Sequence, residues 1–279
     1  MFKTRLLSGI LLVIIALATI IPGNDILFAL LLIVSLIGMS ELYKIMGVHN
    51  KLLGITGYLA AIAYYFLIRL HIKGAGENTV FQYFDKQGLA FLVILFLIFL
   101  MAVYVFSYPK YVADQVMTVF FGVFYVAVML SYVYQTRMIP EEGAFLVWLV
   151  FLCSWGCDTC AYCVGMLIGK HKMAPKLSPK KSVEGGVGGV VGAALLGVLY
   201  AIAVNKWGGA SAEPLMYAVI CGVGGLISMV GDLAASAIKR NHQIKDYGKL
   251  IPGHGGILDR FDSVIFTAPI IYYLGVLFV

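Results

Sequence analysis

The sequence predicts an all-α polytopic integral membrane protein with about nine transmembrane helices, and three observations support this class. Hydrophobic residues make up 61% of the 279 residues and charged residues only 12%. Soluble domains are roughly 45–50% apolar and about 25% charged. Apolar stretches of about 20 residues, the length that crosses a bilayer, recur along the whole chain. Lys and Arg concentrate in alternate connections between these stretches, as the positive-inside rule requires.

The predicted spans follow one another from the N-terminus to the C-terminus. They cover residues 6–22, 26–46, 52–70, 89–107, 115–135, 143–169, 186–204, 214–238 and 263–279. The first stretch is long, and no small-residue cleavage site clearly follows it, so we interpret it as a transmembrane helix rather than a signal peptide. The stretches 52–70 and 143–169 are the ones that we expect to be broken or tilted, if any are.

The distribution of basic residues predicts the orientation. With a cytoplasmic N-terminus, fifteen of the 20 Lys and Arg residues lie in cytoplasmic connections, and nine spans place the C-terminus outside. Eight or ten spans would disturb this segregation. The same rule accounts for the formal net charge of +6, so we expect no nucleic-acid partner. We expect the protein to lie in the inner, cytoplasmic membrane.

The two halves of the chain differ in polarity, which predicts a scaffold over 1–140 and a catalytic region over 141–279 with a polar cavity that faces the cytoplasm. The early spans are rich in Leu, Ile, Val and Phe, and Glu41 is their only acid well inside a span. Glycine becomes dense in the second half, at 185–192, 222–225 and 252–256. Small residues let membrane helices pack closely, and they suggest a homodimer.

Acidic residues lie within or at the ends of helices in the second half. They are Asp158, Asp232, Asp259 and Asp262. An ionised carboxylate in hydrocarbon costs roughly 2.5–3.5 kcal/mol on insertion scales, so such a residue usually faces a polar cavity and a cation. Asp232 precedes Lys239 by seven residues, which is about 10 Å along a helix. Asp232 is therefore near the cytoplasmic face, either as a metal ligand or hydrogen-bonded to a neighbouring helix.

Asp259 and Asp262 are three residues apart, so they share one helical face if the last helix begins near residue 258. One of them would then cap that helix, and Asp262 is the better candidate. Capping does not explain why two carboxylates lie beside Arg260 and His254 among glycines. Clusters of oxygen ligands of this kind suit hard cations such as Mg²⁺.

Two basic segments belong to the cytoplasmic connections, KHKMAPKLSPKKS at 170–182 and KRNHQIKDYGK at 239–249. They could form a surface for lipid headgroups. Next to carboxylates that hold a divalent cation, they would instead form a polyphosphate site. The hydroxyls of Ser178 and Ser182 and the backbone N–H groups of 253–256 would add hydrogen bonds. The glycines of PGHGG leave the backbone bare, so that a phosphate can approach it.

Four cysteines are spaced like metal ligands within one predicted helix. They are Cys153, Cys157, Cys160 and Cys163. One helix cannot easily wrap four thiolates around one ion, and cysteine in apolar surroundings behaves as a small hydrophobe. We therefore interpret the stripe as packing residues. Asp158, beside Cys157, is either a buried hydrogen-bonding residue or a deep wall of the polar cavity.

The segment SAIKRNHQIKDYGKLIPGHGGILDRFD, from Ser236 to Asp262, resembles the signature of the CDP-diacylglycerol synthases, which are also called phosphatidate cytidylyltransferases. The matching residues are Ser236, Lys239, Arg240, Lys245, Asp246, Pro252, His254, Gly255, Gly256, Asp259, Arg260 and Asp262. The stretch DTCAYCVGMLIGKHKMAPKLSPKKSVEGGVGG also resembles a second region of that family. The four cysteines are not part of the pattern, and the first 140 residues resemble the family only in being helical spans.

The resemblance implies that CTP and phosphatidate react to give CDP-diacylglycerol and pyrophosphate, with Mg²⁺, in phospholipid biosynthesis. The expected metal ligands are Asp232 and Asp259, with Asp262 and Asp246 supporting them or binding a second cation. The expected catalytic residues are Asp232, Asp259, Lys239, Arg260 and His254. The expected substrate-binding residues are Ser178, Lys180, Lys181, Ser236, Arg240, Lys245, Gly255 and Gly256. Membrane lipids and a second copy of the chain are the other expected partners.

Other functions account for parts of the sequence. A polyprenol or phytol kinase would need the same metal and phosphate machinery, although the complete His-Gly-Gly and Asp-Arg-x-Asp signature favours cytidylyl transfer. An ion-coupled transporter would use Asp158 and Asp232 as a relay through the membrane, whereas the acids gather toward one face. A lipid-binding scaffold without catalysis would not need paired acids.

Overall fold

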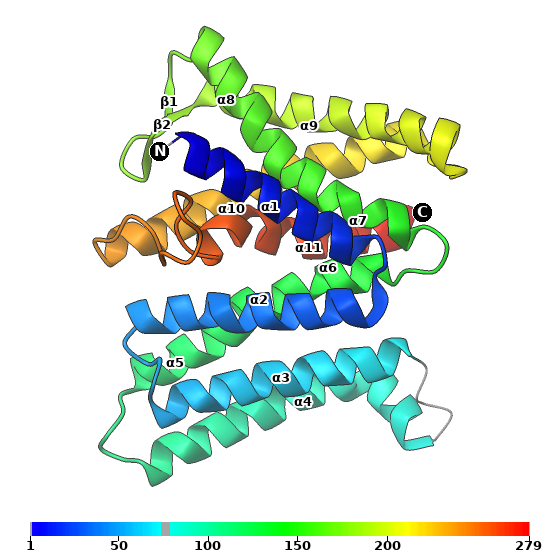
Figure 1. Cartoon of the computed structure of the whole chain (residues 1–279). Helices are drawn as coiled ribbons and strands as arrows, with labels where there is room; N and C mark the ends of the chain where they lie inside the picture. Colours follow the sequence, from blue (N-terminus) through cyan, green and yellow to red (C-terminus); the bar gives the residue numbers. More distant parts are fainter. Residues whose placement is uncertain (1, 74–78, 279) are drawn as a thin grey trace. The chain divides into compact units, whose positions relative to one another are not determined.

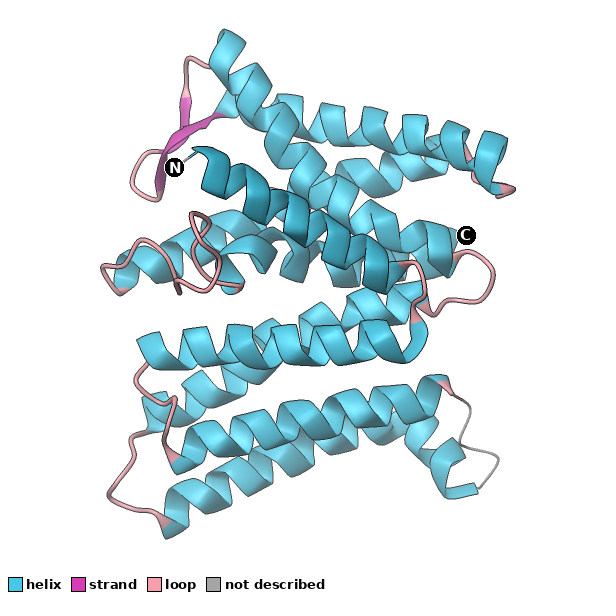
Figure 2. Cartoon of the chain, viewed as in Figure 1, coloured by secondary structure: helices cyan, strands magenta, loops and turns pink. Residues whose placement is uncertain are grey.

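The computed structural model describes residues 2–73 and 79–278, with the side chains of 2–6 and 79–90 left out of the description. Within these residues, seven helical segments are long and apolar enough to cross a membrane. Every backbone N–H and C=O group must be satisfied inside the bilayer, and an α-helix achieves this within one segment. The structure thus confirms the all-α membrane class, with one small hairpin as the described β-structure (Figure 2).

The helices follow the predicted spans closely. Their bounds are α1 Phe2–Ile20, α2 Asn24–Ile45, α3 Leu52–Ile72, α4 Thr79–Phe106, α5 Ala113–Gly122, α6 Met129–Arg137, α7 Gly143–Phe151, α8 Cys157–Ile168, α9 Val183–Ala203, α10 Pro214–Asn241 and α11 Leu258–Phe278. Two predicted spans, the first and the fourth, coincide with shorter apolar segments, Leu7–Ile20 and Phe91–Phe106. The number of helices that cross the membrane therefore stays a prediction.

Three of the spans contain a π-helical segment. These segments are η1 Val123–Val128, η2 Leu152–Gly156 and η3 Val204–Gly208. The segments η1 and η2 join the flanking α-helices into continuous spans, such as Gly143–Ile168, whereas η3 ends the span Val183–Gly208. The stretch that we expected to be broken or tilted is thus continuous, with a wider turn at η2 where α7 passes into α8. Local π-helical turns of this kind are frequent near functional sites.

The chain divides into two compact units. The first unit combines Met1–Gly23 with Tyr132–Val279, and the second unit is Asn24–Ser131. The N-terminal helix α1 therefore belongs to the same unit as the helices α7 to α11, which its position in the sequence does not suggest (Figure 1). The predicted division into a scaffold over 1–140 and a catalytic region over 141–279 concerns function, whereas these units are defined by contacts. That division therefore stays a prediction.

The second unit packs around tyrosine side chains. The hydroxyl of Tyr43 donates to the carbonyl of Val119 at 2.8 Å, and its ring lies against Gly57 and Gly122. A Cβ at Gly122 would stand only 2.3 Å from the Tyr43 ring. The fully buried Tyr65 hydroxyl pairs with Ser35 at 2.7 Å. These buried hydroxyls have partners, as the low dielectric of a membrane interior demands.

Small residues hold the helices of the first unit together. A Cβ at Gly185 in α9 would stand 2.7 Å from the carbonyl oxygen of Ala161 in α8, and one at Gly225 in α10 would stand 3.0 Å from the Cβ of Ala193 in α9. The glycine clusters of α9 and α10 therefore serve close packing inside the unit, as the sequence predicted. Because these glycines pack against helices of the same unit, they give no support to the predicted homodimer, which stays a prediction.

The cysteine stripe packs against these glycines. Cys153 is fully buried, and its Sγ atom would be 2.7 Å from a Cβ at Gly224. The thiol of Cys157 donates to the carbonyl of Gly225 at 3.4 Å. The packing interpretation is confirmed for Cys153 and Cys157, and Cys160 lies against Gly192, whereas Cys163 is exposed.

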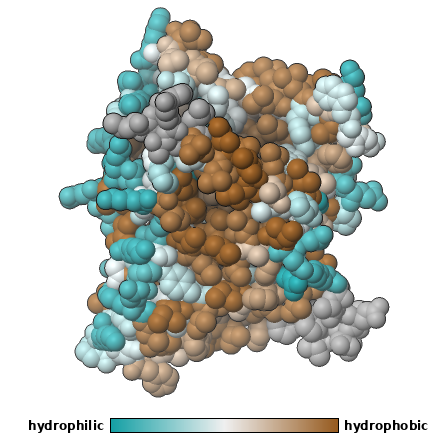
Figure 3. Space-filling model, in the orientation of Figure 1, coloured by the Kyte–Doolittle hydropathy of each residue, from teal (hydrophilic) through white to brown (hydrophobic). Residues whose placement is uncertain are grey.

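Apolar side chains also cover the sides of the helices. In α9, Val187, Val191 and Leu195 are 61%, 53% and 59% exposed. Figure 3 shows hydrophobic residues along the visible helix sides and hydrophilic residues at the helix ends. This distribution suits helices that are surrounded by lipid.

Candidate active site

The residues of the predicted site lie on four segments at one end of the first unit. These segments are a β-hairpin after α8, the C-terminal end of α10, the loop 242–257 and the first turns of α11 (Figure 1). The basic residues Lys239 and Arg240 occupy the last turn of α10, where positive charge is favoured by the helix dipole. Asp259 lies in the first turn of α11, where the dipole favours negative charge.

The hairpin is an element that the sequence analysis missed. Strands β1 Lys172–Ala174 and β2 Ser178–Ser182 pair antiparallel, with Lys172 opposite Ser182 and Ala174 opposite Ser178. Pro179 within β2 argued against a strand, because proline removes a backbone donor. A hairpin of only two strands tolerates it, since each strand has a free edge.

Three contacts fix the hairpin on the helices. Ser182 caps α9 by accepting the N–H of Gly185 at 3.1 Å. The carboxylate of Glu184 accepts the backbone N–H groups of Lys170 and His171 at 3.1 and 3.2 Å. At the tip, the Nε of Arg240 donates to the carbonyl of Leu177 at 3.4 Å. The predicted substrate-binding residues Ser178, Lys180 and Lys181 are thus carried by a strand that is anchored to both α9 and α10.

Asp259 holds the loop between α10 and α11. Its Oδ1 accepts from the ammonium of Lys239 at 2.9 Å, and its Oδ2 accepts the backbone N–H groups of Tyr247 at 2.7 Å and Gly256 at 3.0 Å. The side chain of Asp259 is only 2% exposed. The carboxylate therefore shapes the loop as well as carrying charge, which the motif by itself did not reveal.

The glycines of the loop are required by this arrangement. Gly255 has a φ of +87°, a conformation that side chains other than glycine rarely adopt. A Cβ at Gly255 would also stand 2.8 Å from the Oδ2 of Asp259. The prediction that these glycines let a phosphate approach stays a prediction, because the group that lies against Gly255 here is the carboxylate of Asp259.

Asp232 forms an ion pair with Lys181 of β2, and both side chains are about one-quarter exposed, at 25% and 26%. The carboxylates of Asp158 in α8 and Asp262 in α11 interact electrostatically with that of Asp232. The ammonium of Lys181 also interacts with Asp158. Three helices and one strand thus bring three acids and a lysine into one electrostatic cluster. Asp158 belongs to this electrostatic cluster, and its role as a wall of the polar cavity stays a prediction.

Asp262 does not cap the last helix, which corrects one expectation. The helix begins at Leu258, so Asp262 lies beyond its first turn. The Oδ1 of Asp262 accepts the backbone N–H of the following residue, Ser263, at 2.8 Å. Asp262 is 8% exposed, so its charge is turned inward toward the other acids. The start near residue 258, on which the shared face of Asp259 and Asp262 depended, is confirmed.

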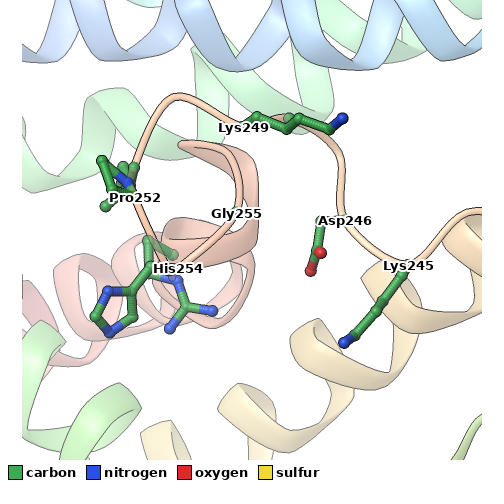
Figure 4. A pocket seen from close by; sticks show the side chains of 10 residues that line it. Lys245, Asp246, Lys249, Pro252, His254 and Gly255 are labelled. Carbon is green, nitrogen blue, oxygen red and sulfur yellow. The ribbon is translucent and has the colours of Figure 1, made fainter. Parts of the chain in front are cut away.

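A pocket of about 620 Å³ opens beside the loop. Its polar lining includes Lys245, Asp246, Lys249, His254 and Arg260. Figure 4 shows the loop as an arch from α10 to α11, with Lys245 and Asp246 on the α10 side and Pro252 and His254 on the α11 side. The Nε atom of Arg260 is buried and has no hydrogen-bond partner among the described residues. An arginine in this state is suited to an incoming anion.

The N-terminal helix contributes a residue that the sequence analysis missed. The hydroxyl of Ser8 in α1 lies 2.7 Å from the Nδ1 of His254 and donates to the carbonyl of Pro252 at 3.2 Å. This serine is embedded in an apolar stretch, LLSGILLVII. Its isolation among apolar residues was the available signal, since a lone hydroxyl inside a span usually has a specific partner.

The structure does not bring every predicted ligand together. Asp246 lines the pocket, whereas Asp232 is bound to Lys181 of the hairpin. Within the described part of the chain, no three His, Cys, Asp or Glu side chains stand in an arrangement that would hold a metal ion. Ser236 lies half-buried on α10, four residues beyond Asp232, and Lys180 is exposed on β2.

Comparison with known proteins decides the family. The model of the cytidylyltransferase family matches residues 3–278. The chain belongs to the cytidylyltransferase family. The phosphatidate cytidylyltransferase of Staphylococcus epidermidis is 32% identical over 277 residues, which cover 98% of each chain. That of Bacillus subtilis is 29% identical over 281 residues, covering 99% of this chain and 98% of the relative. That of Staphylococcus aureus is 29% identical over 279 residues, covering 98% of each.

Membership of the cytidylyltransferase family makes this chain an enzyme, a nucleotidyltransferase, embedded in a membrane by its apolar helices. The match extends over the first 140 residues, where the sequence analysis recognised only helical spans. The inclusion of α1 in the unit that carries the site gives that extension a physical meaning, since Ser8 contacts the signature loop.

Proposed function

We propose that this chain transfers the cytidylyl group of CTP to phosphatidate, forming CDP-diacylglycerol and releasing pyrophosphate, at the cytoplasmic face of the inner membrane. One observation carries the proposal. Lysine and arginine side chains from a hairpin, a helix end and a loop converge with buried carboxylates at one end of a membrane-embedded unit. Both reactants are phosphate anions, and phosphatidate presents its phosphate at the depth of the lipid headgroups.

The reaction needs little covalent chemistry from the protein. An anionic oxygen of phosphatidate attacks the α-phosphorus of CTP, a new P–O bond forms, and the bond from that phosphorus to the β-phosphate oxygen breaks. The electron pair leaves with pyrophosphate. The protein therefore acts by positioning the two anions and by stabilising the charge that develops between them.

The cationic side chains supply this stabilisation. We assign charge neutralisation of the triphosphate and of phosphatidate to Lys239, Arg240, Lys245 and Arg260. The buried Nε of Arg260 supports its assignment, because it has no other acceptor among the described residues. Ser178, Lys180 and Lys181 approach the nucleotide from the hairpin, with Ser236 on α10 beside them. His254, oriented by Ser8, and the backbone of Gly255 and Gly256 hold a phosphate or the leaving pyrophosphate.

Mg²⁺ is part of the proposal, with Asp232 and Asp259 as its ligands and Asp262 and Asp246 supporting it or binding a second cation. The donor set consists of carboxylate oxygens, which suits a hard cation. A carboxylate offers about four acceptor positions, and Asp259 uses three of them for Lys239, Tyr247 and Gly256. Asp232 would have to exchange Lys181 for the ion. When bound, Mg²⁺ would reduce the negative charge of the phosphates.

The orientation is also proposed. Nine spans with a cytoplasmic N-terminus place the hairpin and the loop 242–257 on the cytoplasmic side, where CTP is available. The dense lysine and arginine content of both segments supports this orientation.

The decisive assay measures pyrophosphate release by the purified protein in detergent. We expect release only when CTP, phosphatidate and Mg²⁺ are all present, and no release when ATP or GTP replaces CTP. Phosphorylation of a lipid alcohol by a nucleotide, without pyrophosphate release from CTP, would instead identify a kinase. Silence in both assays would overturn the enzymatic proposal for this site.

A further inference from the structure

Lys181 occupies an unusual position on the hairpin. Its ammonium is paired with Asp232 and interacts with Asp158, so one lysine serves two carboxylates from different helices. The Nζ atom is buried against the Oδ2 atom of Asp232. A buried ammonium is costly unless it is paired, so this carboxylate is the partner that holds Lys181 in place.

The other lysine–aspartate pair of the site is built differently. Lys239 and Asp259 are 12% and 2% exposed, and Asp259 is also held by two backbone N–H groups. That pair is enclosed and fixed. Lys181 and Asp232 are both about one-quarter exposed, and Lys181 has a flexible four-carbon stem on a surface hairpin. Of the two ammonium groups, that of Lys181 is therefore the one that can leave its carboxylate at low cost.

We infer that Lys181 competes with the divalent cation for Asp232, and that CTP relieves this competition by drawing the Lys181 ammonium onto its phosphates. The inference rests on the proposed function, because it takes the nucleotide and the cation from it. An ammonium and a divalent cation cannot use the same carboxylate oxygen at once. Phosphate oxygens offer the ammonium an equivalent anionic partner, so the exchange leaves no charge of the site unpaired.

The exchange couples the two ligands. A cation that arrives alone must displace Lys181 with no new partner for it, and therefore binds weakly. A cation that arrives with CTP finds Asp232 released. Coupling of this kind is reciprocal and typically changes affinity by about 5–150-fold. The device would keep divalent cations from occupying the carboxylates without the nucleotide that they serve.

The test measures binding of Mn²⁺, a spectroscopic substitute for Mg²⁺, to the full-length protein in neutral detergent by electron paramagnetic resonance, with no nucleotide present. We expect Lys181→Met to bind Mn²⁺ about tenfold more tightly than the wild type, within the usual range of coupling energies. Lys180→Met removes the same charge from the neighbouring exposed position and should change the affinity by less than about twofold. Adding Asp232→Asn to Lys181→Met should remove the gain. Lys181→Gln, which keeps a polar side chain, provides a second variant if the methionine variant does not fold.

A second readout separates this role from a merely structural one. In equilibrium dialysis at saturating Mg²⁺, Lys181→Met should retain CTP several-fold less well than the wild type, although it binds the metal alone more tightly. Equal gains in Mn²⁺ affinity for the Lys180 and Lys181 variants, or no gain for either Lys181 variant, would overturn the inference. Pyrophosphate release by the same wild-type preparation keeps the two proposals apart. If release occurs and Lys181→Met gains nothing, only the competition fails.

Discussion

The two compact units bury polar groups in different ways. In the second unit most buried polar side chains are hydroxyls that bond to one another or to the backbone, as Tyr65 does with Ser35 and Tyr43 with Val119. Glu41, at 4% exposed, is the one acid among the described buried residues of that unit. In the first unit the buried polar side chains include Asp259 and Asp262, with lysines beside the acidic cluster. A neutral hydroxyl pair costs little to bury, whereas a charge is expensive unless it is paired. The first unit gathers more acids and carries the larger electrostatic cost, which we interpret as the cost of the site that we propose there.

Asp232→Asn should have the largest effect on activity, because it removes a charge from the acidic cluster of the first unit. The substitution keeps the shape of the side chain and removes the charge that we assign to the metal. We expect pyrophosphate release to fall by about 10²–10³-fold, the usual loss when a group that stabilises the transition state is removed. Because the side chain is one-quarter exposed, the thermal midpoint in detergent should change little. A variant that keeps a near-normal rate dependent on Mg²⁺ would remove Asp232 from the metal site.

Asp259→Asn should lower both activity and stability, unlike Asp232→Asn. The amide can no longer accept from Lys239 and from two backbone N–H groups together. Breaking one side of a buried ion pair costs about 3–5 kcal/mol, and the loop 242–257 should loosen. Limited proteolysis of the loop and the midpoint of unfolding check this expectation. Unchanged protease resistance of the loop would show that Asp259 does not hold it.

Ser8→Ala should produce a smaller, specific defect. It removes the hydroxyl beside the Nδ1 of His254 but leaves the pocket residues in place. Loss of a neutral hydrogen bond is worth about 0.5–1.5 kcal/mol, or roughly a two- to twelvefold effect. We expect it mainly in the KM for CTP or phosphatidate. The conservative variant Ser8→Thr, which keeps the hydroxyl, should recover most of the loss, and failure to do so would argue against a role for that hydrogen bond.

Tyr65→Phe in the second unit should have the smallest effect on activity. A large effect would contradict the contrast between the two units. It removes one buried hydrogen bond to Ser35, so we expect a stability loss of about 1 kcal/mol. The rate of pyrophosphate release at a temperature well below the unfolding midpoint should stay within twofold of the wild type. A large loss of turnover in a folded variant would show that the second unit takes part in the chemistry.

Much of the fold follows from the sequence because the bilayer permits few alternatives. A stretch such as 26–46 must be helical once it lies in hydrocarbon, and α2 spans Asn24–Ile45. The hairpin β1–β2 does not follow in this way. It lies outside the apolar stretches, contains a proline, and depends on contacts with residues far along the chain, such as that between Leu177 and Arg240.

The candidate site also has features that the sequence predicts and features that it does not. The signature residues predicted the loop, the helix end and the acids, because each has its own chemical character. The sequence did not predict which oxygen meets which donor. Asp259 bonds to the backbone of Tyr247 and Gly256, and Asp262 faces inward instead of capping α11. Partners of this kind are set by the backbone path, which spacing alone does not specify.

The contact between Ser8 and Pro252 also constrains how the protein is made. The two residues are separated by 244 positions, so Ser8 leaves the ribosome well before Pro252. At about 5–20 residues per second, roughly 12–50 seconds of translation separate the emergence of these two residues. Throughout that interval α1 must remain in the bilayer with its hydroxyl unable to reach the loop. The site is therefore completed only after the loop 242–257 has been made, so that a nascent chain stalled before this loop carries no assembled centre.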